Sequence, residues 1–148
     1  MNVAIVYASM SGNTQEIAEV IKNVVESKGF TCTLFRTGGT PSSFHDYDMV
    51  LFGSYTWGNG ELPSAMRTEL RSILKERQLN INEAAVFGSG ETQFPKYCRA
   101  VDEMKYHLEN HNVPVRQETL KVEQSCRGSQ MDKVTKWTNE ILEGETWH

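Results

Sequence analysis

Hydrophobic residues in this chain form short continuous runs, separated by longer segments in which they recur every three or four positions. Val3–Tyr7, Asp48–Gly53 and Ala84–Gly88 are runs of the length of a buried strand. Because these runs do not alternate with polar residues, they predict strands covered on both faces, as in a parallel sheet. Two further strands are expected at Thr31–Arg36 and Val113–Val122.

The segments between the runs have helical spacing. Four helices are predicted: Thr14–Ser27, Pro63 to about Arg77, Lys96–Asn110 and Gly128–Leu142. Pro63 suits the first position of its helix, and Met131 is expected on the apolar stripe of the last one. Alternation of five strands with helices predicts an α/β fold, a doubly wound five-stranded parallel sheet with helices on both faces, for which 2-1-3-4-5 is the expected strand order.

Composition narrows the class of protein. A length of 148 residues suits one domain, residues 1–148. A net charge of −4 argues against nucleic-acid binding, which needs a basic surface. No apolar run approaches the roughly 20 residues of a membrane span, and no signal peptide is evident. Three widely spaced cysteines without a CxxC motif argue against a disulfide framework or a zinc site and favour the cytoplasm.

Three unusual loops follow the first, third and fourth strands: Ser9–Thr14, Ser54–Gly60 and Ser89–Phe94. In open α/β sheets, ligands bind beyond the carboxyl ends of the strands, where the strand order reverses. In the order 2-1-3-4-5 these three strands are neighbours. The loops are therefore expected to meet at one crevice.

The first loop, "SMSGNT", has the composition of an anion site at a helix N-terminus. Asn13 or Thr14 is expected to cap the helix, whose first N–H groups lack intrahelical partners and attract an anion. Gly12 allows close approach of a ligand to the backbone. The loop contains no lysine or arginine, and it is neither a P-loop nor a GxGxxG motif. Taken alone, it is equally consistent with an ordinary strand-to-helix turn.

The other two loops each carry an aromatic residue among turn formers. Trp57 precedes Gly58-Asn59-Gly60, and Phe94 is followed by Pro95. Two facing aromatic side chains suggest a planar ligand between them, although Trp57 folded back over the end of the sheet is the alternative. Beside an anion site, such a slot fits a phosphorylated cofactor that contains a ring.

At this point the sequence resembles the flavodoxins, specifically the short-chain kind. Three stretches carry the resemblance: "IVYASMSGNTQEIAEVI" at 5–21, "GSYTWGNGELP" at 53–63 and "FGSGETQFPKYCRAVD" at 87–102. The last predicted strand has no insertion of about twenty residues, which suggests the short-chain type.

The resemblance implies a low-potential one-electron carrier with non-covalently bound FMN. It implies a monomer that shuttles between an NAD(P)H-linked flavodoxin reductase and acceptor redox proteins. The run implied to hold the phosphate is Ser9, Met10, Ser11, Gly12, Asn13 and Thr14. Trp57 and Phe94 would cover the two faces of the flavin, with Thr56 near the ribityl chain. The other implied cofactor-binding residues are Tyr55, Gly58, Asn59, Gly60, Ser89, Gly90, Glu91, Lys96 and Cys98.

Three positions depart from the family pattern. Phe94 stands where tyrosine is usual, and Asn59 and Glu91 stand where aspartates are common. The net charge is also less negative than is usual in the family, which weakens the expectation of partner docking through an acidic rim. Two alternatives on the same fold are an FMN-dependent quinone or NAD(P)H oxidoreductase and an activator of a metalloenzyme through reduced flavin.

Other candidate sites carry less weight. His107 and His111 do not form an HExxH motif and suit a solvated helix end. A phospho-receiver domain would need an aspartate where Ser54 and Tyr55 stand. Cys98 is more consistent with a packed loop cysteine than with a nucleophile.

Overall fold

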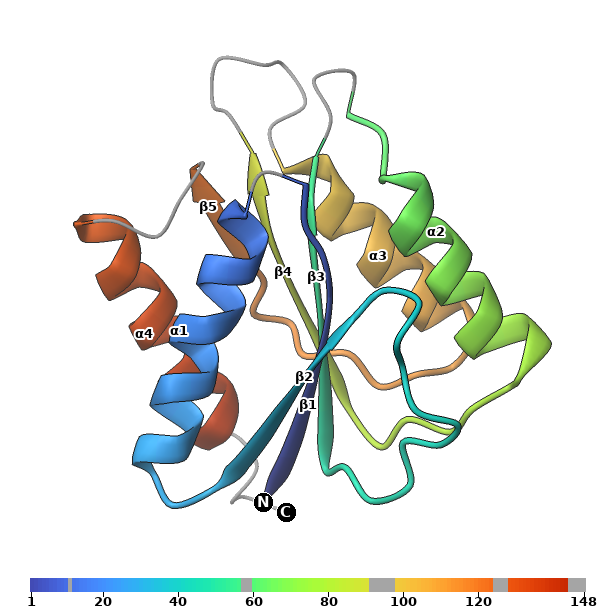
Figure 1. Cartoon of the computed structure of the whole chain (residues 1–148), viewed down its shortest axis with the longest axis horizontal. Helices are drawn as coiled ribbons and strands as arrows, with labels where there is room; N and C mark the ends of the chain where they lie inside the picture. The colour runs from blue at the N-terminus through green and yellow to red at the C-terminus, as the bar shows by residue number, and fades with distance from the viewer. Residues whose placement is uncertain (11, 57–59, 91–97, 124–127, 144–148) are drawn as a thin grey trace.

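A single five-stranded parallel sheet forms the centre of the molecule (Figure 1). The computed structural model describes residues 1–10, 12–56, 60–90, 98–123 and 128–143. The strands are β1 (Asn2–Ala8), β2 (Thr31–Arg36), β3 (Met49–Tyr55), β4 (Ala84–Gly90) and β5 (Leu120–Glu123). Their order is β2-β1-β3-β4-β5, and every pairing is parallel. The predicted topology is confirmed.

Helices cover both faces of this sheet. They are α1 (Asn13–Ser27), α2 (Ser64–Arg71), η1 (Ser72–Glu76), α3 (Arg99–Asn110) and α4 (Ser129–Glu143). Figure 1 shows α1 and α4 on one face and α2 and α3 on the other. Within the described residues, no helix is long and apolar enough to cross a membrane.

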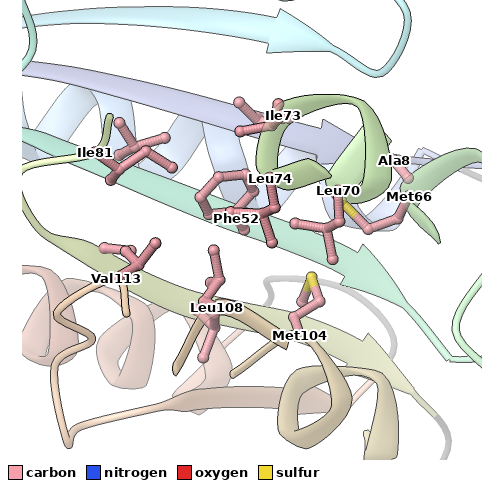
Figure 2. Close-up of a cluster of buried hydrophobic side chains, with 14 of the residues drawn as sticks. Ala8, Phe52, Met66, Leu70, Ile73, Leu74, Ile81, Met104, Leu108 and Val113 are labelled. Carbon is pink, nitrogen blue, oxygen red and sulfur yellow. The ribbon is translucent and has the colours of Figure 1, made fainter. Parts of the chain in front are cut away.

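Each face of the sheet has its own hydrophobic core. On the α1 and α4 side, Ile17, Ile21 and Trp137 pack over β1, β3 and β4. On the other side, Figure 2 shows side chains from α2, η1 and α3 meeting over Phe52 of β3. Met131 is 45% exposed, so its predicted place on the apolar stripe is wrong. The buried stripe of α4 begins one turn later at Val134, and Met131 in the first turn lies beyond the core.

Two strands extend further than their hydrophobic runs. β3 continues through Ser54 and Tyr55, and β4 continues through Ser89 and Gly90, all of which were predicted to lie in loops. The extension is a backbone effect, since Tyr55 pairs with Ser89 and Ser54 with Gly88 irrespective of side-chain polarity. Ladder pairing depends on main-chain N–H and C=O groups that hydrophobic patterning does not report.

The second predicted helix differs at both ends. Pro63 is its N-cap, with extended dihedrals (φ −56°, ψ 144°), rather than its first helical residue. Its second half is the π-helix η1, which closes with a hydrogen bond from the N–H of Arg77 to the carbonyl of Ser72 at 2.8 Å. The wider π turn takes up one extra residue. It brings Arg77 onto the face of Glu69, where Nη2 lies 3.2 Å from Oε2.

The last strand is much shorter than the predicted Val113–Val122. β5 proper is Leu120–Glu123, preceded by an isolated bridge between Val115 and Ala84. Phe87 then pairs with Leu120. Between these two pairings β4 advances three residues while the facing segment advances five, so the segment must bulge and leave the ladder. The carbonyl of Glu118 in the bulge accepts a hydrogen bond from Trp137 Nε1 at 3.0 Å.

Candidate cofactor site

The carboxyl ends of β1, β3 and β4 lie side by side at one edge of the sheet. Ala8 pairs with Ser54, and Tyr55 pairs with Ser89. The N–H of Thr56 donates to the carbonyl of Ser89 at 3.1 Å, which continues the contact past the end of β3. The starts of the three predicted ligand loops therefore meet, as expected for a switch-point crevice.

The turn from β1 into α1 is held by Ser9. Its Oγ accepts hydrogen bonds from the N–H groups of Gly12 at 3.1 Å and Gln15 at 3.4 Å. Gly12 is the N-cap, in a left-handed conformation with φ +91°. The expectation that Asn13 or Thr14 would cap the helix is wrong. Both belong to the first turn of α1. The Ser9 hydroxyl instead accepts the N–H hydrogen bonds that the side chain of a capping residue would accept.

The N-terminus of α1 fits a phosphate group. Asn13 and Thr14 contribute first-turn N–H groups, for which helical geometry supplies no partner, and the helix dipole adds partial positive charge. At Gly12, an added Cβ would meet no atom within 4 Å, so the backbone is open to a close ligand. A dianion held by backbone N–H groups needs this combination of open space and unpaired donors.

Thr14 links this turn to β4. It is 1% exposed, and its Oγ1 lies 3.2 Å from Ser89 Oγ. This contact joins two of the three predicted loops through side chains 75 positions apart in sequence. Because both side chains are buried, this contact ties the start of α1 to the end of β4.

Arg36 is a residue of this region that the sequence analysis missed. Its Nη2 donates to the carbonyl of Ser9 at 2.9 Å, and its guanidinium lies 5.9 Å from the centre of the Tyr7 ring. Arg36 ends β2 and pairs with Tyr7 near the end of β1. The predicted strand order contained the signal, because the last residue of β2 must reach the same edge as the first loop.

Thr56 and Cys98 lie at the start of α3. Thr56 Oγ1 accepts a hydrogen bond from the N–H of Ala100 at 3.1 Å and so stabilises this helix end. A hydroxyl can accept and donate together, so this bond leaves its proton available. Cys98 is fully buried, with Sγ 3.9 Å from the Gly88 carbonyl and 3.8 Å from that of Val122. This environment agrees with a packed cysteine.

Of the remaining candidates, Met10 and Gly60 lie within the part of the chain that the structure describes. Met10 is 71% exposed at the rim of the crevice, and Gly60 has φ +86°. The others lie outside the described residues: Ser11, Trp57, Gly58, Asn59, Glu91, Phe94 and Lys96.

Alternative sites gain no support. Ser54 and Tyr55 do stand at the end of β3, where a phospho-receiver domain needs its aspartate. Over the described part of the chain, histidine, cysteine and acidic residues form no cluster of three that could hold a metal. His111 Nδ1 lies 2.9 Å from the carbonyl of His107, within a helix C-terminus.

The fold and the crevice define a doubly wound α/β protein with an open helix N-terminus, suited to an anion, at the switch point of its sheet. Comparison with known proteins makes this more specific. The sequence profile of the flavodoxins matches residues 5–137. The chain is 40% identical over 120 residues to probable flavodoxin 1 of Bacillus subtilis (strain 168), which covers 80% of this chain and 75% of that protein. It belongs to the flavodoxin family.

Solved structures agree with this assignment. Oxidised flavodoxin 2 from Bacillus cereus superposes with a TM-score of 0.87 at 32% identity, over 97% of this chain and 99% of that one. A short-chain flavodoxin associated with a bacterial microcompartment shares the fold at 18% identity and a TM-score of 0.86, over 97% and 98% of the two chains. As a flavodoxin, the protein is an FMN-binding electron carrier rather than an enzyme, and this role implies redox partners.

Proposed function

We propose that the FMN phosphate is bound at the N-terminus of α1 and the flavin between the loops that follow β3 and β4. The observation that carries this proposal is the convergence of three strand ends on the open backbone at Gly12. Ser9 shapes the turn, and the N–H groups of Asn13 and Thr14 would donate to the phosphate. FMN, when bound, supplies the one-electron chemistry.

The chain's own part is to bind and to shield. We propose that Trp57 and Phe94 cover the two faces of the flavin, and that the backbone of Gly58, Asn59, Gly60, Gly90 and Glu91 surrounds its edge. The sequence resemblance supports these assignments. Backbone donors hold the phosphate without neutralising its charge, so a second negative charge on the flavin would be poorly stabilised. This favours a low potential for the second reduction.

We also propose that the protein is a cytoplasmic monomer that accepts electrons from an NAD(P)H-linked flavodoxin reductase and passes them to redox enzymes. The buried thiols of Cys32 and Cys98 are compatible with a reducing compartment.

The phosphate site is tested by comparing the affinities of the apoprotein for FMN and riboflavin. We expect FMN to bind at least about 100-fold more tightly, because riboflavin lacks the charged acceptor of several hydrogen bonds. Gly12→Ala should weaken FMN binding much more than riboflavin binding, since the new Cβ fills the open space and strains a left-handed residue.

Gly29→Ala is the matched control. Gly29 lies past the other end of α1, also has a positive φ of +84°, and is equally open. Its replacement should cost similar stability and leave the ratio of the two affinities unchanged. Equal loss of FMN and riboflavin binding in Gly12→Ala would contradict the phosphate assignment. Turnover of NADPH with a quinone without added reductase would contradict the carrier role.

A further inference from the structure

A groove lies between α3 and the continuous helix formed by α2 and η1. Figure 1 shows α2 and α3 on the face of the sheet opposite α1 and α4. Its volume is about 380 Å³. None of its lining residues belongs to the cofactor site described above. Cofactor binding therefore does not account for the groove.

One wall of the groove is cationic. Arg67, Arg71 and Lys75 line it, and all three side chains are exposed. The described residues supply no ion-pair partner for any of them, although the chain as a whole has a net charge of −4. Arginines four positions apart on a helix repel each other. These three positive charges therefore lie close together on α2 and η1, and no described carboxylate forms an ion pair with them.

The facing wall contributes one carboxylate, and a neighbouring side chain already engages it. Glu103 Oε2 on α3 lies 3.6 Å from Nε2 of His107. His111, one turn further along α3, completes this wall. Positive charge thus dominates the rim of the groove.

The floor of the groove is apolar. Leu70 and Leu74 form it, with 3% and 9% of their surfaces exposed. Figure 2 shows these two side chains beside Met104 and Leu108 of α3, so the floor is continuous with the core. An apolar floor beneath a charged rim is the arrangement of a site that takes one apolar anchor and orients it by charge.

We propose that this groove, the α2–α3 groove, docks an acidic segment of a redox-partner protein, with an apolar side chain seated over Leu70 and Leu74. Charge complementarity selects the acidic segment. Location supports the partner, because α2 and α3 both begin at the edge of the sheet where β3 and β4 end (Figure 1). The lining runs from Arg67, in the first turn of α2, to Lys75 and His111 at the opposite ends of η1 and α3. A partner held in the groove therefore lies along both helices, and its end at Arg67 is the one nearer to the cofactor edge. The proposal rests on the electron-carrier role but not on the residues assigned to FMN.

The test uses the FMN-loaded protein and a fluorescein-labelled octapeptide of six glutamates and two leucines as the probe. Fluorescence anisotropy at low ionic strength should show binding that weakens as salt is added. The double variant Arg71→Glu/Lys75→Glu should bind the peptide at least about tenfold more weakly. Lys28→Glu/Lys136→Glu makes the same charge change at two exposed positions, the C-cap of α1 and α4, and should change binding less than about twofold.

A second peptide, with serines in place of the leucines, tests the floor. It should bind several-fold more weakly than the first, since no apolar side chain reaches Leu70 and Leu74. No binding of the first peptide would overturn the proposal. So would equal weakening by the two double variants, equal binding of the two peptides, or complete displacement by inorganic phosphate at low concentration. Flavin absorbance, recorded for each variant, separates loss of peptide binding from loss of FMN.

Discussion

Arg36 places a guanidinium beside a loop that itself contains no lysine or arginine. It is exposed, and it holds the loop through the carbonyl of Ser9. The positive charge nearest to the turn before α1 thus comes from Arg36 at the end of β2 and not from the residues of the turn. An exposed charge acts weakly through water, so the effect of Arg36 on a bound phosphate is expected to be modest and sensitive to salt.

Arg36→Gln should weaken FMN binding about two- to fivefold at low salt and leave riboflavin binding almost unchanged. The potential of the second reduction should fall, because a nearby positive charge that favours an anionic flavin has been removed. Titration calorimetry and a spectroscopic redox titration measure the two effects. Arg36→Lys keeps the charge and should restore most of the potential. A change of the same size for riboflavin would show that Arg36 only shapes the loop.

Cys32 illustrates how burial controls the reactivity of a thiol. It is 6% exposed on β2, and burial, with a smaller contribution from Glu26, raises the pKa of its thiol to about 12. The thiolate is the reactive form, so this cysteine should be inert at ordinary pH.

In a Cys126→Ser background, the native protein should therefore resist labelling by a thiol reagent at pH 8, whereas Cys32 and Cys98 should both react after denaturation. The raised pKa also sets a direction for stability. The unfolded chain loses the thiol proton near its ordinary value of 9.0, so the contribution of Cys32 to folding is complete below that pH and declines as pH rises toward 12. Rapid labelling of the native protein would contradict the burial of the site.

At the scale of elements, Glu69 connects α2 to the segment between β2 and β3. Its Oε1 accepts from the N–H of Gly38 at 2.5 Å, and its Oε2 accepts from Thr40 Oγ1 at 3.0 Å. Arg77, brought to this face by the π turn, donates to both Glu69 and Thr40. The π turn of η1 therefore places Arg77 where it joins α2 to the segment between β2 and β3.

Glu69→Ala should lower the free energy of unfolding by about 2 kcal/mol, because three hydrogen bonds to a nearly buried carboxylate are lost together. Glu76→Ala, an exposed carboxylate at the end of η1, should change it by less than about 0.5 kcal/mol. Urea unfolding at saturating FMN measures both. Equal midpoints for the two variants would show that the Glu69 contacts contribute little.

The sequence predicts some of these elements well because their determinants are local. Continuous apolar runs located β1, β3 and β4, and helical spacing located α1 and α3. The wrongly predicted strand ends have non-local causes. Main-chain pairing extends β3 and β4 beyond their apolar runs, and the bulge before Leu120 takes the first part of the predicted last strand out of its pairing with β4. Likewise, the hydrogen bonds from Gly12 and Gln15 to Ser9 and the contact of Arg36 with Ser9 depend on how the turn and the neighbouring strand are placed in three dimensions.

At the scale of the whole molecule, charge is distributed unevenly. The net charge is only −4, yet three cations without described acidic partners gather along one groove. This basic groove is separate from the cofactor loops, through which docking by an acidic rim would occur. We expect such a protein to bind its partners through its own local basic region as well as through the edge of the cofactor site.

The strand order also has a consequence for how the chain acquires its structure. Val3 pairs with Cys32 on one side and with Met49 on the other, and none of the five described strands pairs with a segment close to it in sequence. During synthesis, β1 therefore keeps an open edge until β3 has emerged, and an unpaired apolar edge is prone to association. Because every pairing requires closure of a long loop, the sheet is expected to form slowly compared with the helices.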